Sequence, residues 1–95
     1  VTLDWVAELS IQILNVCKQS GDSTLMGPTL HWAHRFVITQ SEKGNWPREL
    51  NLKTGQVLDE RPTVHPARFL NALGEFLNSF EFESAVRRAF PDGIG

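Results

Sequence analysis

The chain has 95 residues, of which 41% are hydrophobic and 21% are charged, and its formal net charge is −2. This length fits one globular domain spanning residues 1–95 and leaves no room for a second. Binding to DNA or RNA usually requires a basic patch, so direct contact with nucleic acid is not expected.

The sequence carries no mark of a membrane or secreted protein. No apolar run reaches the roughly 18 residues of a membrane span, and no basic-then-apolar leader is visible. Cys17 is the only cysteine, so an internal disulfide is impossible and a small buried thiol is expected. These features predict a cytoplasmic protein without membrane contact.

Residues 3–20 carry the strongest helix pattern. Val6, Leu9, Ile13 and Val16 follow a 3-4-3 spacing, which places them on one helix face. Together with neighbouring apolar residues, this face covers an arc of about 200°, wider than one buried stripe requires. A second molecule is therefore expected to cover part of the arc.

The positions of two residues in this arc predict whether their side chains lie in the core or at an interface. Leu9 lies at its centre and is expected to be buried by the domain's own core. Trp5 lies at its margin, where core and interface fit an aromatic side chain equally well. Thr2 or Asp4 is expected to cap the start of the helix, and Gly21 to end it in the left-handed conformation.

The segment 28–43 is ambiguous between helix and strand. Its large apolar residues stand mostly at even spacing, which is typical of a strand. Pro28 at its start, Gly44 at its end and the Trp32/Phe36 pair at i, i+4 are typical of a helix. The helix is favoured, and the strand remains open.

Residues 49–60 predict a small β-hairpin. Two short apolar segments flank Lys53–Gln56, in which Gly55 suits a backbone position with positive φ. Because two strands alone are marginally stable, the hairpin is expected to pack on helices, with Trp46 covering one side. Pro62 and Pro66 are expected to bracket a rigid connection to the next helix.

A helix is predicted from 66 to 78, followed by a break at Ser79. Beyond Phe80 the apolar residues move to a face rotated by more than about 150°, which one straight helix does not explain. Ser79 suits the N-cap of a second helix that has acidic residues in its first turn and Arg87 and Arg88 in its last. The aromatic and aliphatic side chains expected in the core are Phe69, Leu73, Phe76 and Phe80.

The sequence contains few residue patterns that would indicate a catalytic or metal site. His31 and His34 are three apart and can share a helix face, but a metal ion needs further ligands, and His65 lies far along the chain. Glu81 and Glu83 are two apart and point in different directions on a helix. No catalytic residue, cofactor or metal is therefore expected. The alternatives are a small enzyme or ligand-binding domain that uses the three histidines, and a helical domain that contacts DNA.

Three features characterise the chain. They are a leading amphipathic helix that begins Val1-Thr2-Leu3-Asp4-Trp5-Val6, a middle segment that contains tryptophan, and a phenylalanine-rich end over 66–90. In these features it resembles the small bacterial quorum-sensing anti-activators, cytoplasmic proteins that bind LuxR-type transcriptional regulators. The resemblance implies a non-enzymatic inhibitor that occupies the dimerisation or DNA-binding surface of such a regulator.

We therefore expect a mainly α fold of three or four helices with a small β-hairpin. We expect it to form a homodimer and to bind a protein partner, for which the resemblance indicates a transcriptional regulator. The partner-binding residues predicted from the apolar pattern are Leu3, Trp5, Val6, Leu9, Ile13, Phe82, Val86 and Phe90.

Overall fold

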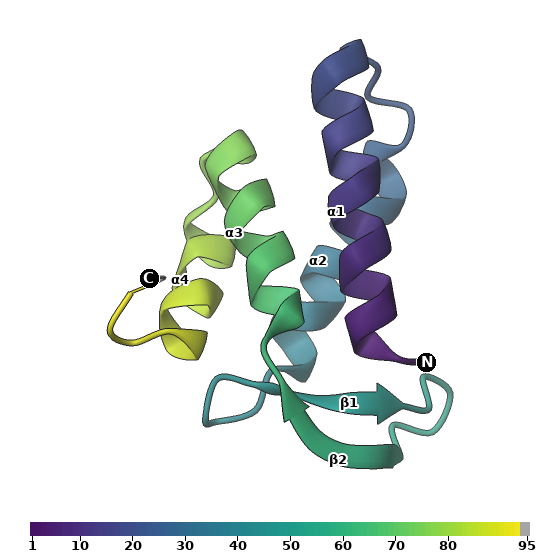
Figure 1. Ribbon diagram of the computed structural model, residues 1–95, viewed down its shortest axis with the longest axis vertical. Helices are drawn as coiled ribbons and strands as arrows, with labels where there is room; N and C mark the ends of the chain where they lie inside the picture. Colours follow the sequence, from purple (N-terminus) through teal and green to yellow (C-terminus); the bar gives the residue numbers. More distant parts are fainter. Residues whose placement is uncertain (94–95) are drawn as a thin grey trace.

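The computed structural model describes residues 1–93, which contain four helices and one two-stranded antiparallel sheet (Figure 1). The elements in chain order are α1 (Leu3–Ser20), α2 (Met26–Thr39), β1 (Trp46–Leu50), β2 (Val57–Thr63), α3 (His65–Leu77) and α4 (Phe80–Ala89). The predicted mainly α fold with a small hairpin is confirmed. None of the helices in these described residues has the length and apolar content needed to cross a bilayer.

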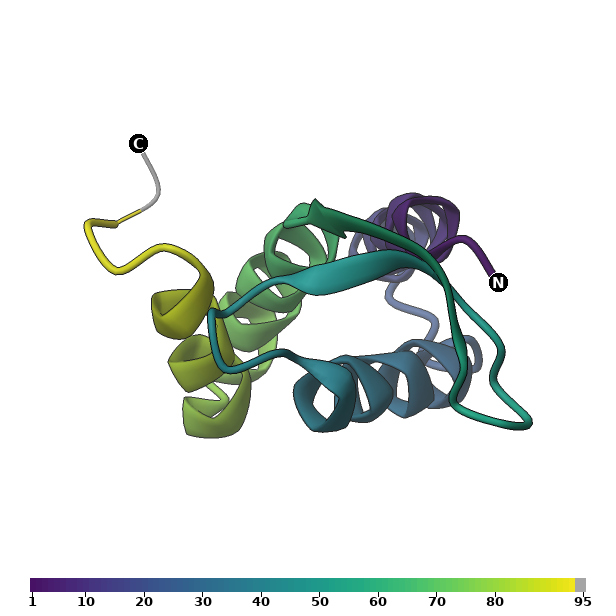
Figure 2. The same cartoon turned by 90° about the horizontal axis from the view of Figure 1, so that it is seen from below.

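The hairpin lies across one end of the helices (Figure 1). Seen from that end, α2 lies on one side of the hairpin and α1 and α3 lie on the other (Figure 2). The Leu50 N–H donates to the Val1 carbonyl oxygen at 2.9 Å, so the start of α1 is tied to the end of β1.

Helix α1 has the predicted bounds but buries a different face from the one expected. Its buried residues recur at alternating steps of four and three, and they are Leu3, Ala7, Ser10, Leu14 and Cys17. Gly21 ends the helix with φ 70° and donates its N–H to the Cys17 carbonyl, as predicted. The expected side-chain cap from Thr2 does not form within the described residues, where Thr2 instead pairs with Glu49 as an isolated β-bridge.

The ambiguous second segment is a helix. Thr29, Ala33 and Phe36 are its buried residues, and their i, i+4, i+7 spacing fits a single helix face. Pro28 lies in the first turn of α2, where a backbone N–H needs no helical acceptor. The even spacing that suggested a strand therefore reflects residues on different sides of a helix.

The hairpin is longer than the predicted 49–60. Trp46 was expected to cover one side of the hairpin. It is instead the first residue of β1, where it pairs with Thr63. Pro62 lies inside β2, opposite Pro47, so the prediction that it belongs to the following connection is wrong. Both strands are sheet edges, where a residue without an N–H is tolerated. Gly55 has φ 75° in the turn, as predicted.

The break between α3 and α4 lies where the sequence predicted it. Asn78 adopts the left-handed conformation with φ 53°, and the Ser79 hydroxyl accepts a hydrogen bond from the Phe82 N–H at 3.4 Å. Helix α4 then runs back along α3 and approaches it closely at Gly74, where an added Cβ would lie 3.4 Å from Phe82 Cβ. This close approach brings Phe82 into the core.

The predicted core residues of α3 divide into two groups. Phe69 and Leu73 are buried, as expected. Phe76 and Phe80 are exposed, so the prediction that they belong to the core is wrong. Phe76 lies in the last turn of α3 and Phe80 is the first residue of α4, so both lie beyond the close contact of the two helices at Gly74, and neither ring is buried there.

An aromatic cluster joins the hairpin to two helices at the centre of the core. The Phe36 ring of α2 lies edge-on to Trp46 of β1, with ring centroids 6.2 Å apart, and edge-on to Phe69 of α3 at 6.0 Å. The Trp46 indole N–H donates to the Phe36 carbonyl oxygen at 2.7 Å. All three side chains are buried, so this polar contact is shielded from water.

The loop between α2 and β1 is fastened to the end of α4. The Gln40 side-chain amide donates to the carbonyl oxygens of Gly44, at 3.0 Å, and Ala85, at 2.9 Å. Gly44 has φ 89°, and a Cβ at this position would overlap the Arg88 carbonyl group. Glycine is therefore required here for two reasons, its backbone conformation and its missing side chain.

The replacement Gly44→Ala should lower the free energy of unfolding much more than Gly55→Ala. Both glycines have positive φ, and the alanine strain there costs about 1 to 2 kcal/mol. Only Gly44 would also collide with a backbone carbonyl, so its total cost should reach at least about 3 kcal/mol. Urea unfolding of both variants measures the difference, and equal losses would contradict the packing of the loop on α4.

Candidate protein-interaction surface

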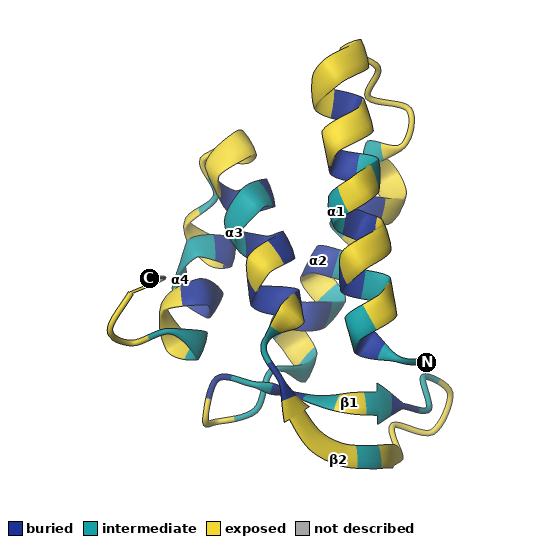
Figure 3. Ribbon diagram, viewed as in Figure 1, coloured by how far each residue is buried: buried dark blue, intermediate teal, exposed yellow. Residues whose placement is uncertain are grey.

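Helix α1 presents a second apolar face that the domain does not bury. Trp5 is 65% exposed, Leu9 48% and Val16 54%, whereas Val6 and Ile13 are half-buried. We call these five residues the outer stripe. At 100° per residue its centre lies roughly 110° around the helix from the centre of the buried face. Figure 3 shows buried and exposed bands alternating along α1.

The edge of the outer stripe forms a groove with α2. The groove has a volume of about 180 Å³. From α1 it is lined by Val6, Leu9, Ser10 and Ile13, and from α2 by Pro28, Thr29 and Trp32. The half-buried side chains of the stripe are those that face α2, so α2 covers one margin of the stripe and leaves Trp5, Leu9 and Val16 to solvent.

A second hollow, of about 230 Å³, opens beside Trp5 at the start of α1. We call it the Trp5 hollow, and its lining residues are Thr2, Asp4, Trp5, Glu8, Arg48 and His65. They come from α1, β1 and the first turn of α3, because the hairpin holds the start of α1 close to both. Its lining residues other than Trp5 are polar or charged, but the indole and the carbon atoms of the other side chains make up most of its surface.

The carboxylate of Asp4 is the least exposed charged group in this hollow. One of its oxygens, Oδ2, lies 3.4 Å from Nε of Arg48. The other, Oδ1, is buried and has no hydrogen-bond partner within the described residues. Leaving a buried acceptor unpaired is costly, and native structures usually satisfy such groups.

The predicted partner-binding residues fall into two groups. Trp5 and Leu9 are exposed, and Val6, Ile13 and Phe90 are half-buried. Leu3, Phe82 and Val86 lie in the core, so placing them at a surface was wrong. Sequence reasoning left out Val16, although it stands seven residues after Leu9 in the same 3-4-3 pattern. The contribution of α2 to the groove had no signal in the sequence.

The exposed aromatic residues at the end of α3 and the start of α4 form a weaker candidate surface. The Lys18 ammonium lies 5.5 Å from the centre of the Phe76 ring, and the Arg87 guanidinium lies 5.9 Å from that of Phe80. Both rings are thus partly covered by cations of the same chain. The outer stripe of α1 has no comparable cover in the described residues.

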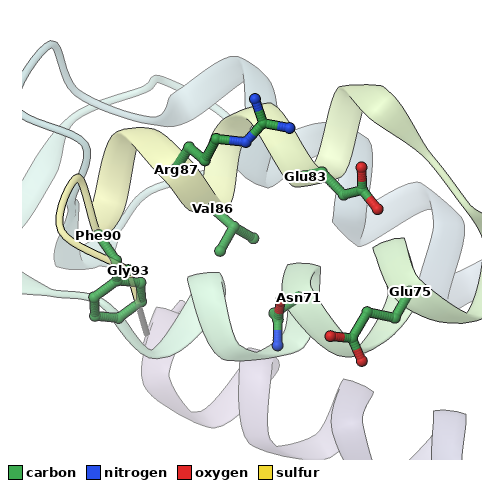
Figure 4. A pocket seen from close by; sticks show the side chains of 7 residues that line it. All are labelled: Asn71, Glu75, Glu83, Val86, Arg87, Phe90 and Gly93. Atoms are coloured by element: carbon green, nitrogen blue, oxygen red, sulfur yellow. The ribbon is translucent and has the colours of Figure 1, made fainter. Parts of the chain in front are cut away.

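A cavity of about 440 Å³ lies between α3 and α4 (Figure 4). Glu75 and Glu83 point into it from opposite helices, and Val86 and Phe90 supply its apolar part. Glu75 is exposed and Glu83 only half-buried, so neither carboxyl has the dry surroundings that acid-base catalysis usually exploits.

The structure does not bring the three histidines together. His31 is exposed and lies edge-on to Trp32, with ring centroids 6.1 Å apart. His34 Nδ1 lies 3.2 Å from Glu81 Oε1, and His65 lines the Trp5 hollow. Residues 1–93 contain no cluster of three or more His, Cys, Asp or Glu side chains arranged to hold a metal ion. A pocket built from all three histidines is therefore not present.

Compared with known proteins, the chain matches no family model, no curated protein and no solved structure. Its function is therefore inferred from the surface of the molecule itself.

Leu9 is about half exposed, so the expectation that the domain's own core buries it is wrong. Leu9→Ala and Trp5→Ala should each lower the free energy of unfolding by less than about 1 kcal/mol, because both side chains are largely in solvent. Leu14→Ala, on the buried face of the same helix, should cost about 2 to 5 kcal/mol. Thermal and urea unfolding of the three variants test this. A loss at Leu9 equal to that at Leu14 would mean that the stripe packs inside the domain.

Proposed function

We propose that this protein is a non-enzymatic regulator that binds another protein through the outer stripe of α1. The observation that carries the proposal is the exposure of a regular apolar stripe on a helix whose other apolar face, roughly 110° away, already fills the core. Val6, Leu9, Ile13 and Val16 stand at the a and d spacing of helices that pack on other helices. Apolar stripes of this kind typically mark binding sites for a helix or for an apolar groove.

The outer stripe also has the composition of a binding surface. Trp5, at its end, is the kind of side chain that supplies a large share of the binding energy in interfaces. Gln12 and Gln19 flank the stripe and are uncharged, so a second apolar helix can approach without desolvating an ion. The groove beside α2 provides a recess into which a partner's side chain can insert.

The resemblance to quorum-sensing anti-activators directs the proposal to a LuxR-type transcriptional regulator in the cytoplasm. The chain would cover the dimerisation or DNA-binding surface of the regulator and draw it, by mass action, into an inactive complex. The same stripe suits a homodimer, because a second copy presents an identical uncharged apolar face. Self-association and binding of the regulator would then compete for one surface.

Self-association should depend on the stripe and not on apolar exposure in general. Leu9→Asp places a charge in the stripe and should shift the protein from dimer to monomer at tens of micromolar concentration. Ile38→Asp is the matched control, because Ile38 is 80% exposed but lies on α2, and it should remain dimeric. Sedimentation velocity measures both. A wild-type protein that stays monomeric would contradict the homodimer.

Binding to a regulator should weaken with the same change. The wild-type chain should release a purified LuxR-type regulator from its DNA site, and Leu9→Asp should need a concentration at least roughly tenfold higher. Ile38→Asp should act like wild type. Fluorescence anisotropy of labelled DNA is the measurement. Unchanged DNA binding in the presence of excess wild-type chain would refute the choice of partner, and equal activity of Leu9→Asp would refute the choice of surface.

A further inference from the structure

The groove between α1 and α2 has apolar walls and a polar base. Most of its lining side chains are apolar, among them Leu9, Ile13 and Trp32. The two polar ones, Ser10 and Thr29, are buried, with 4% and 1% of their surface exposed. None of the lining residues is charged, so the groove suits a neutral group rather than an ion.

The hydroxyl of Ser10 makes no hydrogen bond with any described residue. Serine and threonine within a helix often donate to the carbonyl oxygen four residues earlier. The Ser20 hydroxyl makes such a bond at 2.9 Å, and the Thr39 hydroxyl makes one at 2.8 Å. Ser10 stands in the middle of α1 with the same option, and its hydroxyl does not use it. Its hydrogen-bonding capacity is therefore free for a group from outside the domain.

The oxygen of Ser10 is reached from the groove. The fully buried side-chain atoms that lack a partner in the described residues belong to Asp4, Arg35 and Gln40, so the Ser10 oxygen is not sealed in the core. Because Ser10 is almost wholly buried and lines the groove, the groove is where this oxygen meets solvent. Thr29, by contrast, already donates to a backbone carbonyl of its own helix at 2.8 Å. The free donor at the base of the groove is thus Ser10.

The size of the groove suits one aromatic ring. Its volume is about 180 Å³, and an apolar cavity of about 150 Å³ is enough to hold benzene. A phenylalanine ring would fill the space, but it would separate the Ser10 hydroxyl from water without giving it a partner, which is costly. A tyrosine ring has the same width and carries a phenolic hydroxyl, which both donates and accepts hydrogen bonds. Tyrosine therefore matches the walls and the base of the groove together.

We infer that the groove receives a tyrosine side chain of the protein partner that lies along the outer stripe, with the phenolic hydroxyl hydrogen-bonded to Ser10. The inference rests on the proposed function and adds the partner's anchor residue to it. Val6, Leu9 and Ile13 belong to both the stripe and the groove, so a helix that covers the stripe passes over the groove. A second copy cannot supply the anchor, because the chain contains no tyrosine. The groove therefore favours a different protein over self-association.

The test compares two amphipathic helical peptides of about 16 residues, with Ile and Leu at their a and d positions. They differ at one central position of the apolar face, which is Tyr in one peptide and Phe in the other. The central position is chosen because the groove lies beside the middle of the stripe. Titration calorimetry with the full chain should show the Tyr peptide binding roughly tenfold more tightly, as one buried hydrogen bond would give.

Two variants examine the site itself. Ser10→Ala should abolish the preference for the Tyr peptide, whereas Ser84→Ala, which changes a half-buried helix serine on α4, should preserve it. Ser10→Ala should leave the free energy of unfolding unchanged or raise it, because the hydroxyl has no partner within the domain to lose. A serine kept only for its small size would show no effect of Ala on the peptide preference, so persistence of that preference in Ser10→Ala would overturn the inference.

The outcomes separate this inference from the proposed function. Equal binding of the two peptides to the wild-type chain would overturn the tyrosine anchor, while the stripe would still stand if Leu9→Asp weakened both peptides. Failure of both peptides to bind would overturn the anchor and the proposed function together. Binding of p-cresol alone as tightly as the Tyr peptide would also overturn the inference, because the groove would then be a small-molecule site.

Discussion

The hydrogen bond from the Trp46 indole to the Phe36 carbonyl is the contact on which the arrangement of this small domain depends. A two-stranded hairpin is barely stable by itself, so it needs to be held against the helices. The indole N–H performs this role by reaching a carbonyl in the last turn of α2, and the Phe36 ring at the same time packs on Phe69 of α3. Since this bond is buried, breaking it would leave the indole N–H without a partner in the core.

The position of the hairpin determines what surrounds the start of α1. Leu50 in β1 binds the Val1 carbonyl, and Arg48, two residues earlier, pairs with Asp4. His65 begins α3, and only Val64 separates it from β2. The Trp5 hollow is thus assembled from three elements that are far apart in the sequence and meet only because the hairpin is held in place.

Helix α1 connects the core to the surface proposed for binding. It carries two apolar faces, one filled with Leu3, Ala7 and Leu14, and the other with Leu9 and Val16. A domain of this size has too little interior to cover both, because the buried fraction of the surface falls as the chain shortens. The uncovered face is where a partner would gain most by excluding water.

Local signals in the sequence determined where α1 ends and where α4 begins. Gly21 ends α1 and Ser79 caps α4, because left-handed glycine and a hydroxyl N-cap depend on neighbouring residues alone. The hairpin turn at Gly55 was equally local. The apolar pattern also identified Trp5, Val6, Leu9 and Ile13 as candidates for binding, since an arc of about 200° is too wide for one core.

Only the tertiary structure decided which apolar face turns inward. The two stripes of α1 have the same type of spacing, and the outer one is the more apolar because the buried one contains Ala7 and Ser10, so hydrophobicity within the helix does not predict that Leu3 rather than Leu9 turns inward. The choice is made by α2, α3 and the hairpin, which pack on the Leu3 side. The same holds for Phe82, which is buried because α4 folds back across Gly74, while Phe76 and Phe80 remain outside. The energy of burial depends on what covers a side chain, and that comes from segments distant in the sequence.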